Sequence, residues 1–148
     1  MALTQAMATS FKTELLTGLH NFTNTTGDTF NIALFRATAS IVGTFGAATT
    51  NYSDMGADEA SGTNYSAGGI ALTNVTPTSS GTTAFTDFVD AVFSNVTLTA
   101  SGALIYNATD GNRAVAVLDF GGDKTATAAD MTIIFPAAAA ATAIIRLV

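Results

Sequence analysis

The chain has 148 residues, of which 11% are charged, and it contains one histidine, no cysteine and no tryptophan. Because soluble domains average about 25% charged residues and most catalytic schemes use His, Cys, Lys or converging carboxylates, this composition disfavours an enzyme. It also excludes disulfides and thiolate metal sites. The net charge of −6 and the scattered positions of the basic residues exclude a nucleic-acid surface, which needs clustered Lys and Arg.

Length and hydropathy indicate the organisation of the chain. No stretch contains the roughly 18 apolar residues that span a bilayer, and the few basic residues disfavour contact with an anionic membrane surface. Residues 1–16 lack a basic segment followed by an uninterrupted apolar run, so we expect no secretory signal and synthesis in a cytoplasm. The length predicts one domain over residues 1–148.

The first elements in the chain are marked by an apolar stripe. Apolar residues recur at every fourth position, at Leu3, Met7, Phe11, Leu15 and Leu19. This spacing predicts an amphipathic helix over residues 3–19, within an N-terminal helical part at 1–20 that ends before the polar run 21–28. If the stripe faces a partner, its first four members are the candidates for an assembly interface: Leu3, Met7, Phe11 and Leu15.

The remainder of the chain has the pattern of short strands separated by turns. Residues 29–37 form the first predicted strand, and 38–66 form a long connection with at most one short turn of helix. Seven further strands are predicted after residue 67, at 68–77, 82–93, 95–100, 102–108, 113–120, 131–136 and 142–148.

Residues that favour turns lie between these strands. Asp110-Gly111 between two apolar runs predicts a hairpin, and Gly121-Gly122-Asp123 predicts another turn. Since no crossover helices lie between the strands, the spacing predicts a mainly β fold. We expect an antiparallel β-sandwich, similar to a jelly roll, over residues 29–148, with the amphipathic helix at its N-terminus.

Individual residues offer little chemistry. His20 lies at the C-terminal end of the predicted helix, where a histidine interacts favourably with the helix dipole, and no second histidine is available for a metal pair. Asp87 and Asp90 are three positions apart on a predicted strand, so their side chains should point to opposite faces. That arrangement disfavours a shared glycosidase site.

Two groups of acidic residues could supply oxygen ligands for calcium, although no EF-hand or Gly-Asp-rich repeat accompanies them. The groups are Asp54, Asp58 and Glu59, and Asp119, Asp123 and Asp130. We interpret both as solvated loop residues. The sequence therefore assigns no catalytic, cofactor-binding or metal-binding residue.

Several sequence blocks carry a resemblance to a known family. They are the opening MALTQAMATSFKTELLTGLHNF, then FNIALFRATA, SGTNYSAGGIALTNVTPTSSGTTAFTDF, GALIYNATDGNRAVAVLDFGGDKTATAADMTIIFP and the closing IIRLV. In this order, and over nearly the whole chain, they resemble a recurrent family of small virion structural proteins of tailed bacteriophages. The resemblance supplies no catalytic residues.

The resemblance implies a non-enzymatic virion protein that needs no cofactor and assembles as a homo-oligomer, such as a homotrimer. Its expected partners are copies of itself and the major capsid protein or tail proteins. We expect a capsid decoration protein, with a tail, fibre or adaptor component as the alternative, in which loop 38–66 faces the host. A carbohydrate-binding or carbohydrate-active module is a more distant alternative, because only Tyr52, Tyr65 and Tyr106 could supplement phenylalanine in stacking on a sugar.

Overall fold

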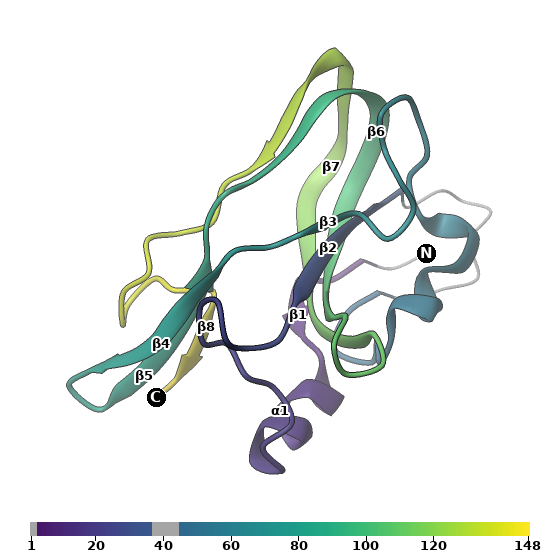
Figure 1. Ribbon diagram of the computed structural model, residues 1–148. Coiled ribbons are helices and arrows are strands. Elements are labelled where there is room, and N and C mark those ends of the chain that lie inside the picture. Colours follow the sequence, from purple (N-terminus) through teal and green to yellow (C-terminus); the bar gives the residue numbers. More distant parts are fainter. Residues whose placement is uncertain (1–2, 37–44) are drawn as a thin grey trace.

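The computed structural model describes residues 3–36 and 45–148, and this part of the chain is mainly β, as predicted (Figure 1). Residues 38–44 of the predicted connection lie outside the described residues. The elements are β1 (Ala6–Met7), α1 (Thr9–Leu16), β2 (Phe30–Phe35), the 3-10 helix η1 (Tyr52–Asp58), β3 (Ile70–Ala71), β4 (Asn74–Ser80), β5 (Thr83–Phe88), β6 (Ala91–Asn107), β7 (Arg113–Ile133) and β8 (Ile145–Leu147).

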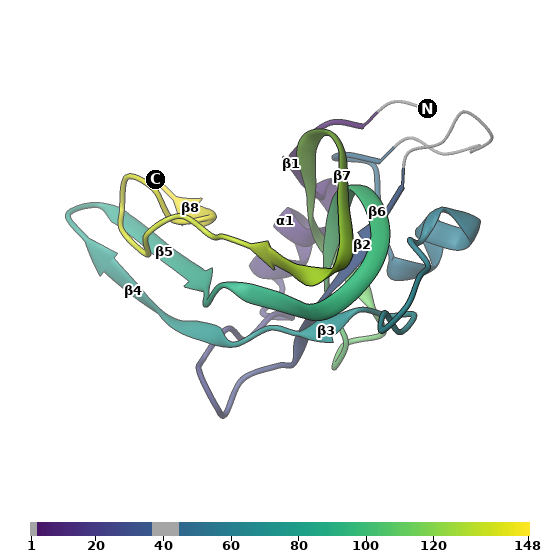
Figure 2. The same ribbon diagram turned by 90° about the horizontal axis from the view of Figure 1, so that it is seen from above.

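The strands form two antiparallel sheets. A five-stranded sheet has the order β1-β7-β6-β2-β3, and a three-stranded sheet has the order β4-β5-β8. Figure 2 shows the three-stranded sheet extending from one end of the curved β6–β7 hairpin. We call this three-stranded sheet the arm.

The β6–β7 hairpin connects the two parts of the molecule. Its turn at 108–112 contains Asp110-Gly111, which confirms the predicted hairpin. The predicted turn at Gly121-Gly122-Asp123 is wrong, because β7 continues through these residues as a bulge. Gly102 pairs with Asp119 and Ala100 pairs with Lys124, so four residues of β7 lie opposite one residue of β6. A bulge of this kind bends a strand without ending it.

Phenylalanine rings join the arm to the five-stranded sheet. Phe22 stacks on Phe30 of β2 at a centroid distance of 4.3 Å, and Phe30 lies 5.7 Å from Phe88 of β5. Phe88 in turn lies 5.7 Å from Phe135, which follows β7. All four rings are buried, so the core is continuous between the two sheets.

The N-terminal segment differs from the predicted helix over 3–19. Ala6 and Met7 pair with Val117 and Ala116 at the edge of β7, and helix α1 covers only Thr9–Leu16. Backbone groups at the edge of β7 form hydrogen bonds with the segment before α1, and these bonds replace those of a first helical turn. The apolar spacing of residues 3–19 alone does not indicate that this edge is nearby. None of the helices in residues 3–36 and 45–148 has the length and apolarity of a membrane-spanning helix.

Candidate functional site

The four residues predicted for an assembly interface lie in different environments. Phe11 is fully buried, and its ring centroid lies 4.9 Å from that of His20 and 6.0 Å from that of Phe22. Leu3, Met7 and Leu15 are half-buried against the core. The stripe is therefore not one exposed face, and the Phe11 ring fills the chain's own core. Contact of these four residues with a partner stays a prediction.

The amphipathic pattern predicted for the helix is also incomplete. Glu14 is buried on α1, whereas its neighbour Leu16 is 90% exposed. Burial on this helix is thus set by the partners of each side chain and not by its hydrophobicity alone. Leu16 is the most exposed leucine in the described part of the chain.

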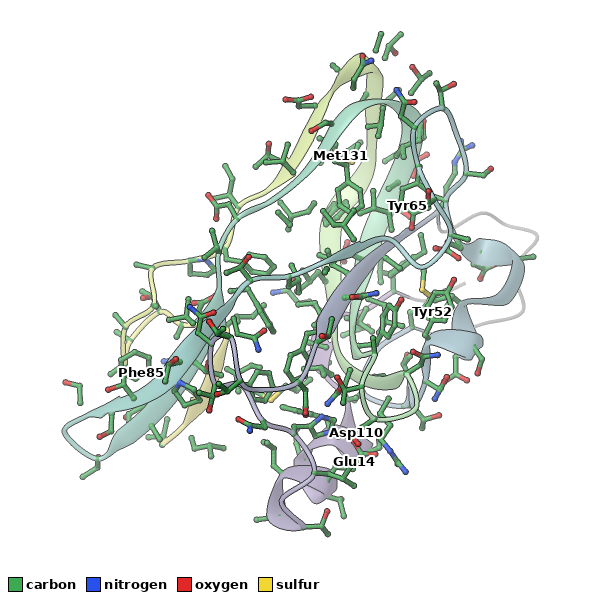
Figure 3. The ribbon with its side chains drawn as sticks, in the orientation of Figure 1. Glu14, Tyr52, Tyr65, Phe85, Asp110 and Met131 are labelled. Atoms are coloured by element: carbon green, nitrogen blue, oxygen red, sulfur yellow. The ribbon has the colours of Figure 1, made fainter. Side chains whose placement is uncertain are left out.

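An apolar cleft of about 440 Å³ lies between the end of α1 and the arm. Its lining includes Leu15 and Phe22 on one side and Phe85 and Leu147 on the other. Leu147 remains 58% exposed and the following Val148 is 94% exposed, and Figure 3 shows Phe85 on the arm. Exposed apolar side chains at the mouth of a cleft are typical of an interaction surface.

The two edges of the arm differ in their ability to pair. The edge strand β4 contains Pro77, and its register shifts between Val75 and Thr78. Proline and bulges both block the addition of another strand. The opposite edge strand, β8, has neither feature, and its second and third residues, Arg146 and Leu147, are exposed. The β4 edge of the arm is therefore protected by a proline and a bulge, whereas the β8 edge is protected only by its short length and by Arg146.

A polar network connects α1 with the turn of the β6–β7 hairpin. The buried His20 imidazole lies 2.7 Å through Nε2 from Glu14 Oε2, and Arg113 donates to the other Glu14 oxygen at 3.0 Å. Asn107 Nδ2 lies 3.0 Å from His20 Nδ1 and donates to Asp28 at 2.8 Å. Figure 3 shows Glu14 beside the turn that contains Asp110.

The geometry assigns the protons in this network. Asn107 Oδ1 accepts from the backbone N–H groups of Thr109 and Asp110, which fixes the amide with its NH₂ toward His20. His20 Nδ1 therefore accepts a hydrogen bond, and its Nε2–H donates to Glu14. The pair resembles a catalytic carboxylate–histidine dyad, but its histidine is fully buried. The predicted role of His20 at the helix end is replaced by this contact with the Glu14 side chain.

A second network gathers all three tyrosines of the chain near Glu59. Tyr52 and Tyr65 donate to its two carboxylate oxygens at 2.6 and 2.9 Å, and Gly68 N–H donates at 2.6 Å. Tyr106 donates to the carbonyl of Gly68 and stacks on Tyr52 at 4.7 Å. Burial and the bond to Glu59 raise the pKa of Tyr52 to about 12, so these phenols remain protonated donors.

This network corrects the interpretation of the first acidic group as solvated. Asp54 is exposed but caps η1 by accepting from the backbone of Thr50 and Asn51. Glu59 is half-buried among the tyrosines, and Asp58 is 94% buried. Tyrosine positions scattered over the sequence gave no signal of this cluster, because only the fold brings them together.

The other acidic residues mostly bind backbone or face solvent. Asp87 is buried and accepts from the N–H groups of Phe88 and Ile144, while Asp90 accepts from that of Phe135. The three members of the second group, Asp119, Asp123 and Asp130, are exposed as predicted, but they lie on strand β7 and not in loops. Within the described residues no three His, Cys, Asp or Glu side chains are arranged to hold a metal ion.

Two further clefts lie on the five-stranded sheet. One, of about 510 Å³, lies where β1 approaches the C-terminal half of β7, and its lining includes Phe120, Met131 and Ile134. The other, of about 390 Å³, lies where residues 57–61 cross β6 and β7, and its lining includes Asp58 and three threonines. The first is lined by polar and apolar atoms in similar shares, and the second is largely polar.

Comparisons of the chain with protein-family models, with curated proteins and with solved structures find no match.

Proposed function

We propose that this protein is a non-enzymatic structural subunit of a tailed-phage virion that acts by homo-oligomeric assembly, as a capsid decoration protein would. The observation that supports this proposal most directly is the arm, where an apolar cleft adjoins the exposed Leu147 on the edge strand β8. The resemblance of the sequence blocks to virion proteins supports the same proposal.

The composition of the surface favours permanent assembly. A face rich in threonine, serine and asparagine contains few ions to desolvate, so its burial against a neighbour costs less than that of a charged face. Symmetric assemblies bury such faces between identical subunits. On a lattice, each bound subunit contact raises the effective concentration of the next, so weak contacts become strong together.

The placement of the polar side chains supports a structural role. Glu14, Glu59 and Asp87 bind side chains or backbone of the same chain, and these bonds hold together segments distant in the sequence. Groups engaged in this way hold a fold together. We also propose that the two sheets form the sandwich-like unit expected from the sequence, joined by the Phe30–Phe88–Phe135 contacts.

Mass measurement in solution tests assembly through the arm. We expect the wild-type protein to form an oligomer by size-exclusion chromatography with light scattering, and Leu147→Asp to shift it toward monomer. The matched control is Val92→Asp on β6, because Val92 is 44% exposed and lies outside the arm. A monomeric wild type at all accessible concentrations, or equal effects of the two variants, would contradict assembly through the arm.

A tail, fibre or adaptor component is the second candidate. The β4–β5 hairpin projects from the arm, and its residues 76–82 are all exposed and mostly Thr and Ser (Figure 1). A projecting polar hairpin fits contact with a host surface. The number of copies per particle distinguishes this candidate from a decoration protein.

A further inference from the structure

The chain's single histidine lies between α1 and the turn that follows β6. The His20 side chain is fully buried, and its ring centroid lies 4.9 Å from that of Phe11 and 6.3 Å from that of Phe30. Within the described part of the chain each ring nitrogen has one polar partner, Glu14 Oε2 at 2.7 Å and Asn107 Nδ2 at 3.0 Å. These two partners must therefore accommodate any change in the protonation of the ring.

The Asn107 side chain cannot rotate to meet a second proton without losing other hydrogen bonds. Its Oδ1 accepts from the backbone N–H groups of Thr109 and Asp110 at 3.0 and 3.1 Å, and its NH₂ group donates to Asp28 at 2.8 Å. In this orientation the NH₂ group also donates to the lone pair of His20 Nδ1. A proton on Nδ1 would place two N–H groups face to face and abolish that hydrogen bond.

The charged groups around the histidine come from four parts of the chain. Glu14 of α1 contacts Nε2 and is itself paired with Arg113 of β7 at 3.0 Å. Asp28 and Asp110 lie 2.8 and 3.5 Å from Asn107 Nδ2, the group that faces Nδ1. These carboxylates can balance the charge of an imidazolium, whereas the hydrogen bond from Asn107 requires a neutral ring.

We propose that His20 is a pH switch, in which uptake of a proton at Nδ1 displaces the Asn107 side chain and releases its hydrogen bonds to the turn at 108–112. In the neutral state Asn107 bridges the histidine and Asp28. In the protonated state the amide moves away, and the carboxylates of Asp28 and Asp110 become available to the Nδ1–H. The inference does not depend on the proposed virion function.

An NMR titration of the wild-type protein tests this switch. The range from about pH 8 to about pH 5 is the one in which histidine ordinarily changes charge. The ring ¹⁵N shifts report the protonation of His20 without ambiguity, because the sequence contains no second histidine. We expect the side-chain NH₂ signals of Asn107 and the backbone N–H signals of Thr109 and Asp110 to change with the same midpoint as the ring.

Two controls accompany the titration. Asn64 Nδ2 donates to the carbonyl of Asn95 at 2.8 Å near the start of β6, whereas Asn107 is the last residue of this strand. The Asn64 NH₂ signals should therefore not follow the ring. The Asn107→Asp variant places a carboxylate oxygen where the NH₂ group now faces Nδ1. Because a carboxylate accepts from a protonated ring, this variant should raise the midpoint of the ring titration by at least about one pH unit.

Three results with the wild type would overturn the switch. These are protonation of the ring without a change in the Asn107 and turn signals, a ring that already carries both protons at about pH 8, and a ring that stays neutral until the chain unfolds in acid. An unchanged or lower midpoint in Asn107→Asp would contradict the role of this side chain. The wild-type results decide the question even where the variant does not fold.

Discussion

Two buried aspartates differ in the one property that decides their effect on stability. Asp58 and Asp87 are 6% and 1% exposed, and burial raises the pKa of both. Asp87 accepts hydrogen bonds from Phe88 and Ile144, which oppose this rise, whereas burial is the one cause that acts on Asp58. Hydrogen bonds thus favour the charged form of Asp87, whereas no such bond from the described residues acts on the Asp58 side chain.

We predict opposite effects for the two amide variants. Asp58→Asn should raise the free energy of unfolding at neutral pH slightly, by less than about 1 kcal/mol, because burial raises the pKa of Asp58 and the amide removes the charge that burial disfavours. Asp87→Asn should lower it by about 1–3 kcal/mol, because the amide replaces one of two acceptor oxygens with a donor. Urea denaturation of both variants measures the difference, and a loss of stability in Asp58→Asn would contradict this account.

The pH dependence provides an independent test of Asp58. A carboxyl whose pKa is raised in the folded state binds its proton more tightly there than in the unfolded chain. Its favourable contribution is therefore complete below the unfolded pKa and is lost as pH rises through the folded pKa. We expect the stability gain from Asp58→Asn to be larger at pH 7 than near pH 4, and a gain independent of pH would rule out this mechanism.

Substitution of Phe11 on α1 tests whether this residue belongs to the core or contacts a partner. Phe11→Ala should lower the free energy of unfolding by about 3–5 kcal/mol, because it leaves a cavity beside Phe22 and His20. Leu16→Ala, on the same helix at 90% exposure, should change it by less than about 0.5 kcal/mol. Thermal or urea unfolding measures both variants. A near-neutral Phe11→Ala would mean that the ring does not belong to the core.

At the scale of elements, close backbone approach fixes the segment that precedes β3. Gly69 has a φ of +74°, and a Cβ at this position would collide with the carbonyl of Ile32 in β2. The neighbouring β2–β3 pairing includes Ile32 opposite Ile70, so the glycine allows β3 to join the sheet. Glycine is required here by space as well as by conformation.

Gly69→Ala and Gly81→Ala form a matched pair that isolates this steric effect. Gly81 also has a positive φ, of 59°, but no atom lies within 4 Å of its hypothetical Cβ. We expect Gly81→Ala to cost about 1–2 kcal/mol from backbone strain alone, and Gly69→Ala to cost clearly more because the backbone must also move. Equal unfolding midpoints for the two variants would show that the β2–β3 approach is not tight.

The pattern of the sequence predicts some elements and misses others for identifiable reasons. Strand β2 and the Asp110-Gly111 turn follow from local alternation and turn chemistry, and both were predicted correctly. The helix over 3–19 was wrong because pairing of Ala6 and Met7 with β7 is a tertiary effect. Gly121-Gly122 signals a break in local conformation, and the sequence contains nothing that distinguishes a bulge from a turn at this point.

The candidate sites were less predictable than the fold. Asp58 and Glu59 are adjacent in the sequence, yet no described residue binds the Asp58 side chain, while the Glu59 side chain binds two tyrosines and Gly68. Tyr106, on β6, belongs to the same cluster although it follows Glu59 by 47 residues in the sequence. Composition identifies which chemistries are scarce, but only the packing of distant segments decides which polar groups are satisfied.

At the scale of the whole molecule, the two sheets have different roles in this account. The networks around Glu14 and Glu59 tie α1 and the segment after η1 to the five-stranded sheet. The arm contains the edge strand β8 and the exposed Leu147, and it is joined to the rest through the phenylalanine cluster. An exposed apolar surface on such an arm is suited to repeated assembly, in which each copy offers the same surface to its neighbours.

Quantitative mass spectrometry of virions purified from a culture that expresses this chain tests the central proposal most directly. The measurement compares the copy number of this protein per particle with that of the major capsid protein. A decoration protein predicts a number comparable to that of the capsid subunits, whereas a tail or fibre component predicts a small number that matches tail symmetry. Absence of the protein from the purified particles would contradict the proposal that it is a virion structural subunit.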